Sequence, residues 1–118
     1  MIPVAANNIP GLFAQPNDFD RKRIERALKA RERYRYVTPC VATVVGGYRI
    51  ESPCCSRNID PDGGIIDIAL LLYDDDCDSW RLFRKNHSRR AWEFDSAYGR
   101  LIELLEELKA DPERKFWQ

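Results

Sequence analysis

Residues 63–95 constrain the fold of this chain more than any other stretch, because they read as three consecutive β-strands. The first strand, residues 65–73, is apolar except for Asp67. Side chains alternate between the two faces of a strand. We therefore expect the even-numbered positions to form the buried face, which consists of Ile66, Ile68, Leu70 and Leu72.

Two turns divide the rest of this stretch into a second and a third strand. The segment at residues 74–79, which is acidic except for Cys77 and Ser79, has low strand propensity and predicts the first turn, after which Trp80 opens the second strand. A second turn is expected at residues 86–89, and Trp92 and Phe94 follow it on one face of the third strand. We expect Trp80 and Trp92 in the core, and a layer that covers the apolar face of this meander.

A helix is predicted over residues 17–34, after an irregular, proline-rich arm at residues 1–16. Asn17 or Asp18 can cap its free backbone N–H groups, and Pro16 prevents its extension toward the N-terminus. The outer face of this helix is basic. Its inward face is expected to hold Phe19, Ile24, Ala27, Leu28 and Arg31.

A hairpin is predicted before the long meander. Pro39 cannot donate a ladder hydrogen bond, so the segment that holds it should be an edge strand or two short pieces. The pair Gly46 and Gly47 predicts a tight turn in which both glycines take positive φ. Tyr48 and Ile50 should then face inward on the returning strand.

A second helix is predicted over residues 96–110. Ser96 can cap it, and Pro112 disfavours helical backbone at the residue before it. Phe116 and Trp117 are expected to close the core beyond its end. Leucines recur at helical spacing along one side, where they should cover the apolar face of the meander: Leu101, Leu104, Leu105 and Leu108.

Together these segments predict a single α+β domain. Its 118 residues are enough to bury a substantial core, and 44% hydrophobic with 32% charged residues suits a globular protein. We expect an antiparallel meander of four or five strands, with an N-terminal and a C-terminal helix packed on one face. The domain, residues 1–118, would comprise the arm (1–16), the first helix (17–34), the sheet (35–95) with a long loop (52–64), the second helix (96–110) and a tail (111–118).

The sequence predicts a cytoplasmic protein that does not enter the membrane. No apolar run approaches the roughly 18 residues of a transmembrane helix, and the first residues do not resemble a signal peptide. The cysteines are therefore expected to be reduced rather than to form a disulfide framework: Cys40, Cys54, Cys55 and Cys77. The oligomeric state is left open.

A metal- or thiol-dependent enzyme is one hypothesis for the function. It would use Cys54, Cys55 and His87, together with the aspartates of residues 60–67. However, the cysteines include no C-x-x-C pair, the acids lack the spacing of a calcium loop, and a catalytic cysteine needs a histidine beside it. We therefore predict no catalytic residue, no metal ligand and no cofactor, and keep this enzyme as the alternative.

The basic segment around the second turn favours a different hypothesis. Guanidinium groups pair with phosphates and aromatic faces stack on bases, so cations beside Trp80, Phe83 and Trp92 suit a nucleic acid or an acidic protein surface. The formal net charge is zero, so any such attraction is local. We predict a non-catalytic binding or regulatory domain whose anion-binding residues are Arg81, Arg84, Lys85, His87, Arg89 and Arg90, with Arg26 and Lys29 from the first helix.

The C-terminal half resembles a family of small bacterial proteins described only as domain of unknown function three-zero-two-four. The matching parts are the strand WRLF at residues 80–83, the basic segment that leads to Trp92, the leucine-rich second helix, and the ending DPERKFW at residues 111–117. The resemblance implies a small α+β fold and brings no activity with it.

Overall fold

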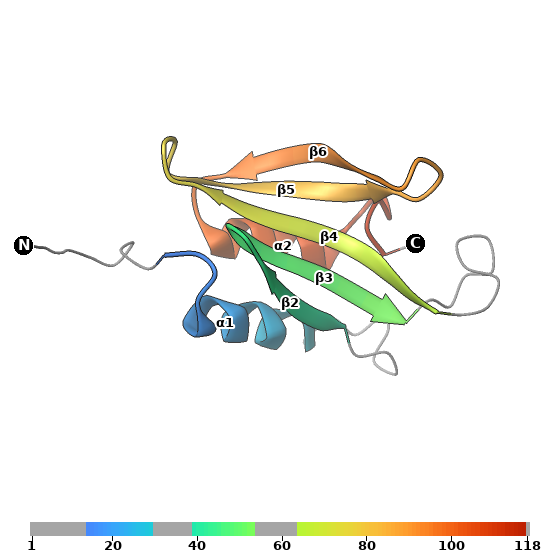
Figure 1. The fold of residues 1–118 in the computed structure, drawn as a ribbon, viewed down its shortest axis with the longest axis horizontal. Coiled ribbons are helices and arrows are strands. Elements are labelled where there is room, and N and C mark those ends of the chain that lie inside the picture. The colour runs from blue at the N-terminus through green and yellow to red at the C-terminus, as the bar shows by residue number, and fades with distance from the viewer. Residues whose placement is uncertain (1–13, 30–38, 54–63, 118) are drawn as a thin grey trace, which may run out of the picture.

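The computed structural model describes residues 14–29, 39–53 and 64–117, and within them it contains a five-stranded antiparallel sheet and two helices (Figure 1). The elements in chain order are α1 (Asp18–Lys29), β2 (Cys40–Val44), β3 (Gly47–Pro53), β4 (Ile65–Asp74), β5 (Ser79–Asn86), β6 (Ala91–Tyr98) and α2 (Leu101–Ala110). Neighbouring strands in the chain are neighbours in the sheet, so the order β2-β3-β4-β5-β6 is the predicted meander.

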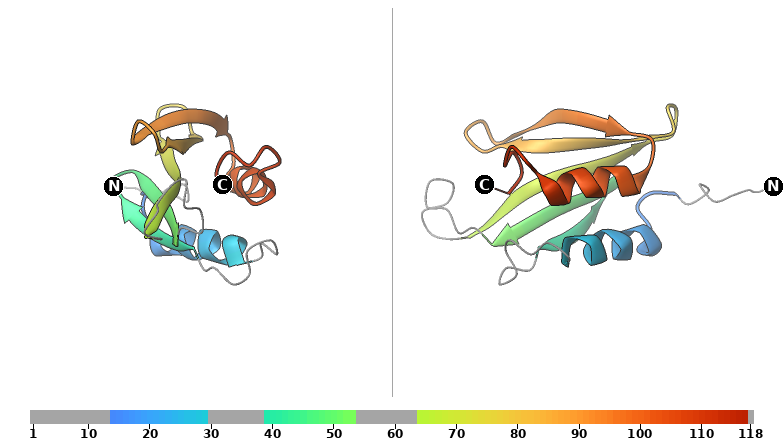
Figure 2. Two further views of the ribbon diagram at one scale, coloured as in Figure 1. Left: turned by 90° about the vertical axis from the view of Figure 1, so that its right-hand side faces the viewer. Right: turned by 180° about the vertical axis from the view of Figure 1, so that it is seen from behind.

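Both helices cover the same face of the sheet, as predicted (Figure 2). α1 contacts the edge strand β2, α2 contacts β5 and β6, and the helices contact each other. We refer to the covered side as the inner face and to the opposite side as the open face. In the described part of the chain, neither helix is long and apolar enough to cross a membrane.

The core lies between the two helices and the inner face. The predicted leucine stripe of α2 is buried, and so are Tyr48 and Ile50 on β3 and Phe116 and Trp117 after α2. These observations confirm which segments build the core. The other buried apolar residues are Ile24, Leu28, Val41, Ile68, Ala69, Leu71, Trp80 and Leu82.

A β-bulge in β4 changes which of its residues face the core. Ile68 is the extra residue, and the alternation of side chains shifts by one position after it. Ala69 and Leu71 are therefore buried in place of the predicted Leu70 and Leu72, which are only partly buried. That prediction is wrong because a continuous apolar run carries no sign of the shift.

A second bulge, in β6, turns two aromatic residues outward. Asp95 is the extra residue, because the pairs on either side of it are Leu82↔Ser96 and Phe83↔Phe94. The shift places Trp92 and Phe94 on the open face. Trp92 is only partly buried, contrary to the prediction, whereas Trp80 lies in the core as expected. Bulges also increase the local twist, and the sheet curls around α2 (Figure 2).

α1 begins where the sequence predicted. The side-chain Oδ1 of Asn17 caps it by accepting the backbone N–H of Asp20 at 2.7 Å. Ile24 is buried as expected, but Phe19 is 64% exposed, so it does not belong to the inward face. The described helix ends at Lys29, and its predicted continuation lies outside the described residues.

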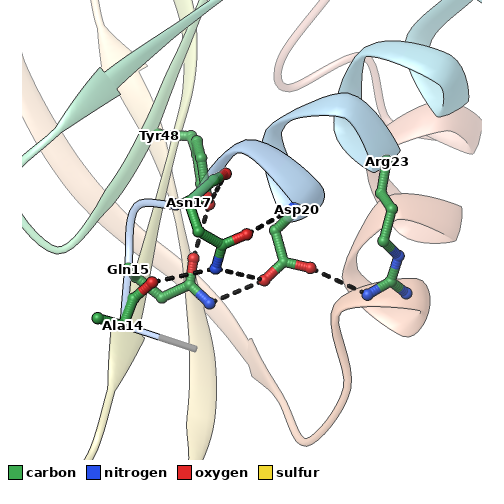
Figure 3. A network of polar contacts seen from close by, with 6 residues as sticks. All are labelled: Ala14, Gln15, Asn17, Asp20, Arg23 and Tyr48. Atoms are coloured by element: carbon green, nitrogen blue, oxygen red, sulfur yellow. Dashed lines mark hydrogen bonds and ion pairs between the residues drawn. The ribbon is translucent and has the colours of Figure 1, made fainter. Parts of the chain in front are cut away.

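A polar network fixes the start of α1 against β3 (Figure 3). The buried hydroxyl of Tyr48 donates to Gln15 Oε1 at 2.7 Å and accepts the backbone N–H of Asn17 at 2.8 Å. The carboxylate of Asp20 accepts from Gln15 Nε2 at 2.8 Å and pairs with Arg23 at 3.1 Å. Burial raises the pKa of Tyr48, so its hydroxyl keeps the proton that this network uses.

α2 begins at Leu101 and not at Ser96. β6 continues to Tyr98, so Ser96 lies within a paired strand and cannot cap the helix. The cap is made by Glu103, whose side chain accepts the backbone N–H of Arg100 at 3.1 Å. The predicted start is wrong because Ser96 resembles a cap in sequence but is held by the sheet.

Asp111 organises the segment DPERKFW after α2. Its side chain is buried, with 3% of the residue exposed, and it accepts backbone N–H groups. The donors are Lys115 at 2.8 Å, Phe116 at 3.1 Å and Trp117 at 2.8 Å. Trp117 Nε1 also donates to the carbonyl oxygen of Leu108 at 2.9 Å. Charge-assisted bonds of this kind are stronger than neutral ones, so the motif holds the last aromatic residues in the core.

The turn between β2 and β3 consists of Val45 and Gly46 rather than of the two glycines. Gly46 has a positive φ of 83°. Gly47 instead pairs with Val44 as the first residue of β3. It has a different need for glycine, because a Cβ at this position would lie 1.8 Å from the backbone oxygen of Leu71.

Gly47→Ala should therefore destabilise the protein much more than Gly46→Ala. A methyl group at position 47 overlaps the backbone of β4, and overpacking of this kind costs about 3 kcal/mol. At position 46 the methyl group meets open space. The cost there is about 1 kcal/mol, because alanine is strained at a positive φ. Urea unfolding measures both free energies, and equal losses would contradict the close approach of β3 to β4.

Asp111→Asn should lower the free energy of unfolding by about 2–3 kcal/mol, because a neutral amide weakens hydrogen bonds that a carboxylate accepts. Asparagine tolerates the left-handed backbone of this position, where φ is 36°. The loss thus reports hydrogen bonds rather than backbone strain. Urea unfolding measures it, with Glu113→Gln at an exposed position of the same segment as the control. Equal losses in the two variants would show that Asp111 does not hold the segment.

Candidate functional site

The predicted anion-binding residues are not brought together into one surface. Side chains alternate along β5, so Arg84 projects toward the inner face whereas Arg81 and Lys85 project from the open face. Arg26 and Lys29 are exposed on α1, which packs beside the edge strand β2. The β5–β6 turn lies near the opposite edge of the sheet (Figure 1). The hairpin and the first helix are therefore two separate basic surfaces.

The three cations on β5 itself each pair with an acid. The pairs are Arg81 Nη2 to Asp74 Oδ2 at 2.6 Å, Arg84 Nη2 to Glu93 Oε1 at 3.8 Å, and Lys85 Nζ to Asp67 Oδ2 at 3.0 Å. Partly exposed pairs of this kind contribute little to stability. They do neutralise each other's charge, so β5 presents little net positive charge to a partner.

The turn at residues 87–90 holds the remaining predicted residues. Asn86 fixes it, because its Oδ1 accepts the backbone N–H of Arg89 at 3.1 Å and its Nδ2 donates to Glu93 Oε2 at 3.0 Å. Arg89 and Arg90 are both exposed. The ion pairs of this hairpin are made by the cations of β5. No acid in the described residues forms an ion pair with either of these two arginines. The tip of the hairpin therefore concentrates two guanidinium groups.

His87, in the same turn, carries little charge at neutral pH. Burial lowers its pKa below the usual 6.5, the positive charge of Lys85 lowers it further, and Asp67 only partly opposes them. The sequence predicted His87 as one of the anion-binding residues. At neutral pH it can act as a hydrogen-bonding group, and it adds positive charge only in acid.

Aromatic rings lie on the open face beside this turn. Phe83 and Phe94 are cross-strand neighbours whose ring centroids are 5.7 Å apart, with an edge-to-face angle of 75°. Lys85 Nζ lies 4.8 Å from the centroid of the Trp92 ring. Phe94 is 56% exposed. We refer to Phe83, Trp92 and Phe94 as the aromatic face.

The sequence indicated only part of this arrangement. The binding hypothesis named Trp80, Phe83 and Trp92 beside the cations, and of these Trp80 lies in the core, where the strand pattern placed it. Phe94 was not among the predicted site residues. Its position on the open face depends on the bulge at Asp95, and no feature of the sequence marks that bulge.

An ion-pair network on β3, β4 and β5 borders the aromatic face. Asp67 pairs with Lys85, and also with Arg49 Nε at 3.5 Å. Arg49 Nη2 in turn pairs with Glu51 Oε2 at 3.2 Å. No pattern in the sequence groups Arg49 with the hairpin. The acids of this network are engaged by cations, so they do not leave the open face with a net negative charge.

Two pockets lie away from the hairpin, in the part of the chain that the structure describes. One of about 380 Å³ opens between the starts of α1 and α2, and its buried Asp20 is engaged by Arg23. Another, of about 260 Å³, lies beside Asp95 and Lys115, which pair at 2.8 Å. Burial opposes ionisation of Asp95, but the hydrogen bonds from Lys115 and Ser96 outweigh it and hold the pKa of Asp95 below its usual range. Asp20 in the first pocket and Asp95 in the second are thus each paired with a cation.

The residues of the alternative enzyme are only partly described. Cys54, Cys55 and the segment before residue 64 lie outside the described residues. Asp67 is engaged by Lys85 and Arg49. Among the residues that the structure describes, no three histidine, cysteine or acidic side chains gather as metal ligands would.

Comparison with protein families places the chain in a family. Residues 13–118 match the family described as Domain of unknown function (DUF3024), so the match covers most of the chain. The chain belongs to this family. The resemblance noted in the C-terminal half therefore extends through the sheet and both helices. No curated protein and no solved structure matches the chain.

The pKa of His87 should lie below 6.5 and should rise in Lys85→Met. Removal of the Lys85 charge removes a repulsion that disfavours the imidazolium, while burial of the ring remains. His87 is the single histidine of the chain, so its ring signals in an NMR pH titration need no further assignment. A wild-type pKa at or above 6.5 would contradict this account of the turn.

Proposed function

We propose that this protein is a non-catalytic binding or regulatory domain that recognises an anionic partner through the tip of the β5–β6 hairpin. The observation that carries the proposal is the pair of adjacent exposed arginines, Arg89 and Arg90, which pair with no acid in the described residues. Guanidinium groups bind phosphates and carboxylates in a planar, two-pronged geometry. A cytoplasmic setting, expected from the sequence, is part of the proposal.

The backbone of the turn supports this choice. Arg90 has a positive φ of 55°, and a residue with a Cβ pays about 1 kcal/mol or more in this region. Glycine or asparagine would occupy the position at lower cost. Residues held in strained backbone conformations cluster at functional sites, which supports a binding role for Arg90.

The ion pairs of β5 also support the turn as the binding site. Arg81, Arg84 and Lys85 already have acidic partners, so an anion would have to displace those partners to reach them. Arg89 and Arg90 need no such exchange. A salt-dependent attraction is therefore expected to come from the turn.

Arg89→Gln/Arg90→Gln should weaken binding of a fluorescent abasic DNA strand about tenfold at low salt. Each lost phosphate contact on a single strand lowers the salt slope by about 0.7, so the double variant should lose about 1.4. Fluorescence anisotropy over a series of salt concentrations measures both quantities. An abasic strand offers phosphates without bases, so the test isolates recognition of the anion.

Arg26→Gln/Lys29→Gln on α1 is the matched control, because it removes the same charge from the other basic surface. It should change the affinity by less than about threefold. A larger loss in the α1 variant than in the hairpin variant would move the site to α1. No binding by the wild type at low salt would refute recognition of phosphate chains altogether.

A further inference from the structure

The geometry points to single-stranded nucleic acid as the ligand of this hairpin, with its phosphates at the turn and its bases stacked on the aromatic face. This inference rests on the proposed function and names its partner. It is carried by a feature that an anion site alone does not need, which is the set of rings at Phe83, Trp92 and Phe94 on a face that neither of the two described helices covers.

The rings do not serve the core. The buried side of the same hairpin is filled by Trp80 and Leu82, whereas Phe94 remains 56% exposed on the other side. The bulge at Asp95 produces this outward orientation. Phe83 and Trp92 beside it are partly buried. Apolar rings grouped on one accessible surface are a mark of a binding site.

The rings and the cations are close enough to contact the same nucleic-acid strand. Arg90 ends the turn, and Trp92 is the second residue of β6. Trp92 and Phe94 are two positions apart on one face of β6, so their Cα atoms are separated by about 6.6 Å. An extended single strand of nucleic acid can therefore place a phosphate at the turn and successive bases on the rings.

Two features favour a single strand over a duplex. Stacking on a side chain requires a base whose face is free, and the bases of a duplex already stack on one another. The polar groups nearest to the rings, Lys85, Asp67 and Arg49, are engaged in ion pairs. Few groups remain there to read base edges, so we expect binding with little dependence on sequence.

An acidic protein surface fits this site less well. Carboxylates would satisfy Arg89 and Arg90 but would leave the aromatic face without a partner. Base–aromatic stacking contributes about 1–3 kcal/mol per base, which corresponds to about 5- to 150-fold in affinity. The rings should therefore decide the affinity if the partner carries bases.

Fluorescence anisotropy with the purified full chain tests the inference by comparing three probes of equal length: a mixed-sequence DNA strand, the same strand without bases, and polyglutamate. The strand with bases should bind at least about tenfold more tightly than the abasic strand. Trp92→Ala and Phe94→Ala should each weaken binding of the base-bearing strand by about 5-fold or more. Neither variant should change binding of the abasic strand by more than about twofold.

Two further variants keep the result interpretable. Trp92→Phe should retain most of the affinity, because a ring remains for stacking. Val45→Ala removes an exposed apolar side chain from the β2–β3 turn, and it should leave all three affinities unchanged. Circular dichroism of each variant shows whether the sheet is intact. Should Trp92→Ala fail to fold, Phe94→Ala at an exposed position carries the test, with Phe94→Tyr as its ring-preserving match.

The outcomes separate this inference from the proposed function. Equal, salt-dependent binding of the base-bearing and abasic strands would leave the anion site standing and overturn base stacking. Polyglutamate that binds as tightly as the base-bearing strand would overturn the nucleic acid in favour of an acidic protein. Binding that depends on the rings but not on Arg89 and Arg90 would overturn the proposed anion site, and with it the inference.

Discussion

The leucines of α2 need a concave surface, and the sheet can offer one only by bending. Leu101, Leu104, Leu105 and Leu108 are all buried between α2 and the inner face. The sheet curls around α2 (Figure 2), and bulges add to the twist that every sheet has. Bulges at Ile68 and Asp95 supply the extra twist, one in β4 and one in β6. The same two bulges determine which side chains of β4 and β6 lie on the open face. The packing of α2 and the composition of the open face therefore depend on the same bending of the sheet.

The sequence predicted the architecture well, because its signals were local and strongly periodic. The leucine spacing, the Asn17 cap and the burial of Phe116 and Trp117 all follow from neighbouring residues, and the five-stranded meander confirms the fold class. The errors at Leu70 and Trp92 have a single cause. A bulge depends on pairing with another strand, so alternation along one strand cannot reveal it.

The sequence predicts which residue types occur at the candidate site, but not which of them are free to bind. A basic, aromatic segment can be read from the sequence, but the pairing of its cations cannot, because their partners come from other positions: Asp67 from β4, Glu93 from β6 and Asp74 from the end of β4. Those pairs neutralise most of the positive charge of β5. The positive charge that remains unpaired in this hairpin lies at the turn. The residues that remain available are a small subset of the basic ones, and three-dimensional pairing selects them.

The bulge at Asp95 also affects how copies of this protein meet in concentrated solution. β6 is an edge strand of the sheet, and a regular, apolar edge is a template for strand addition and aggregation. Here the unpaired row of backbone groups is interrupted at Asp95, which also carries a charge paired with Lys115. Phe94 and Trp92 can thus lie on the open face beside such an edge, while the bulge and the charge discourage sheet extension between copies of this protein.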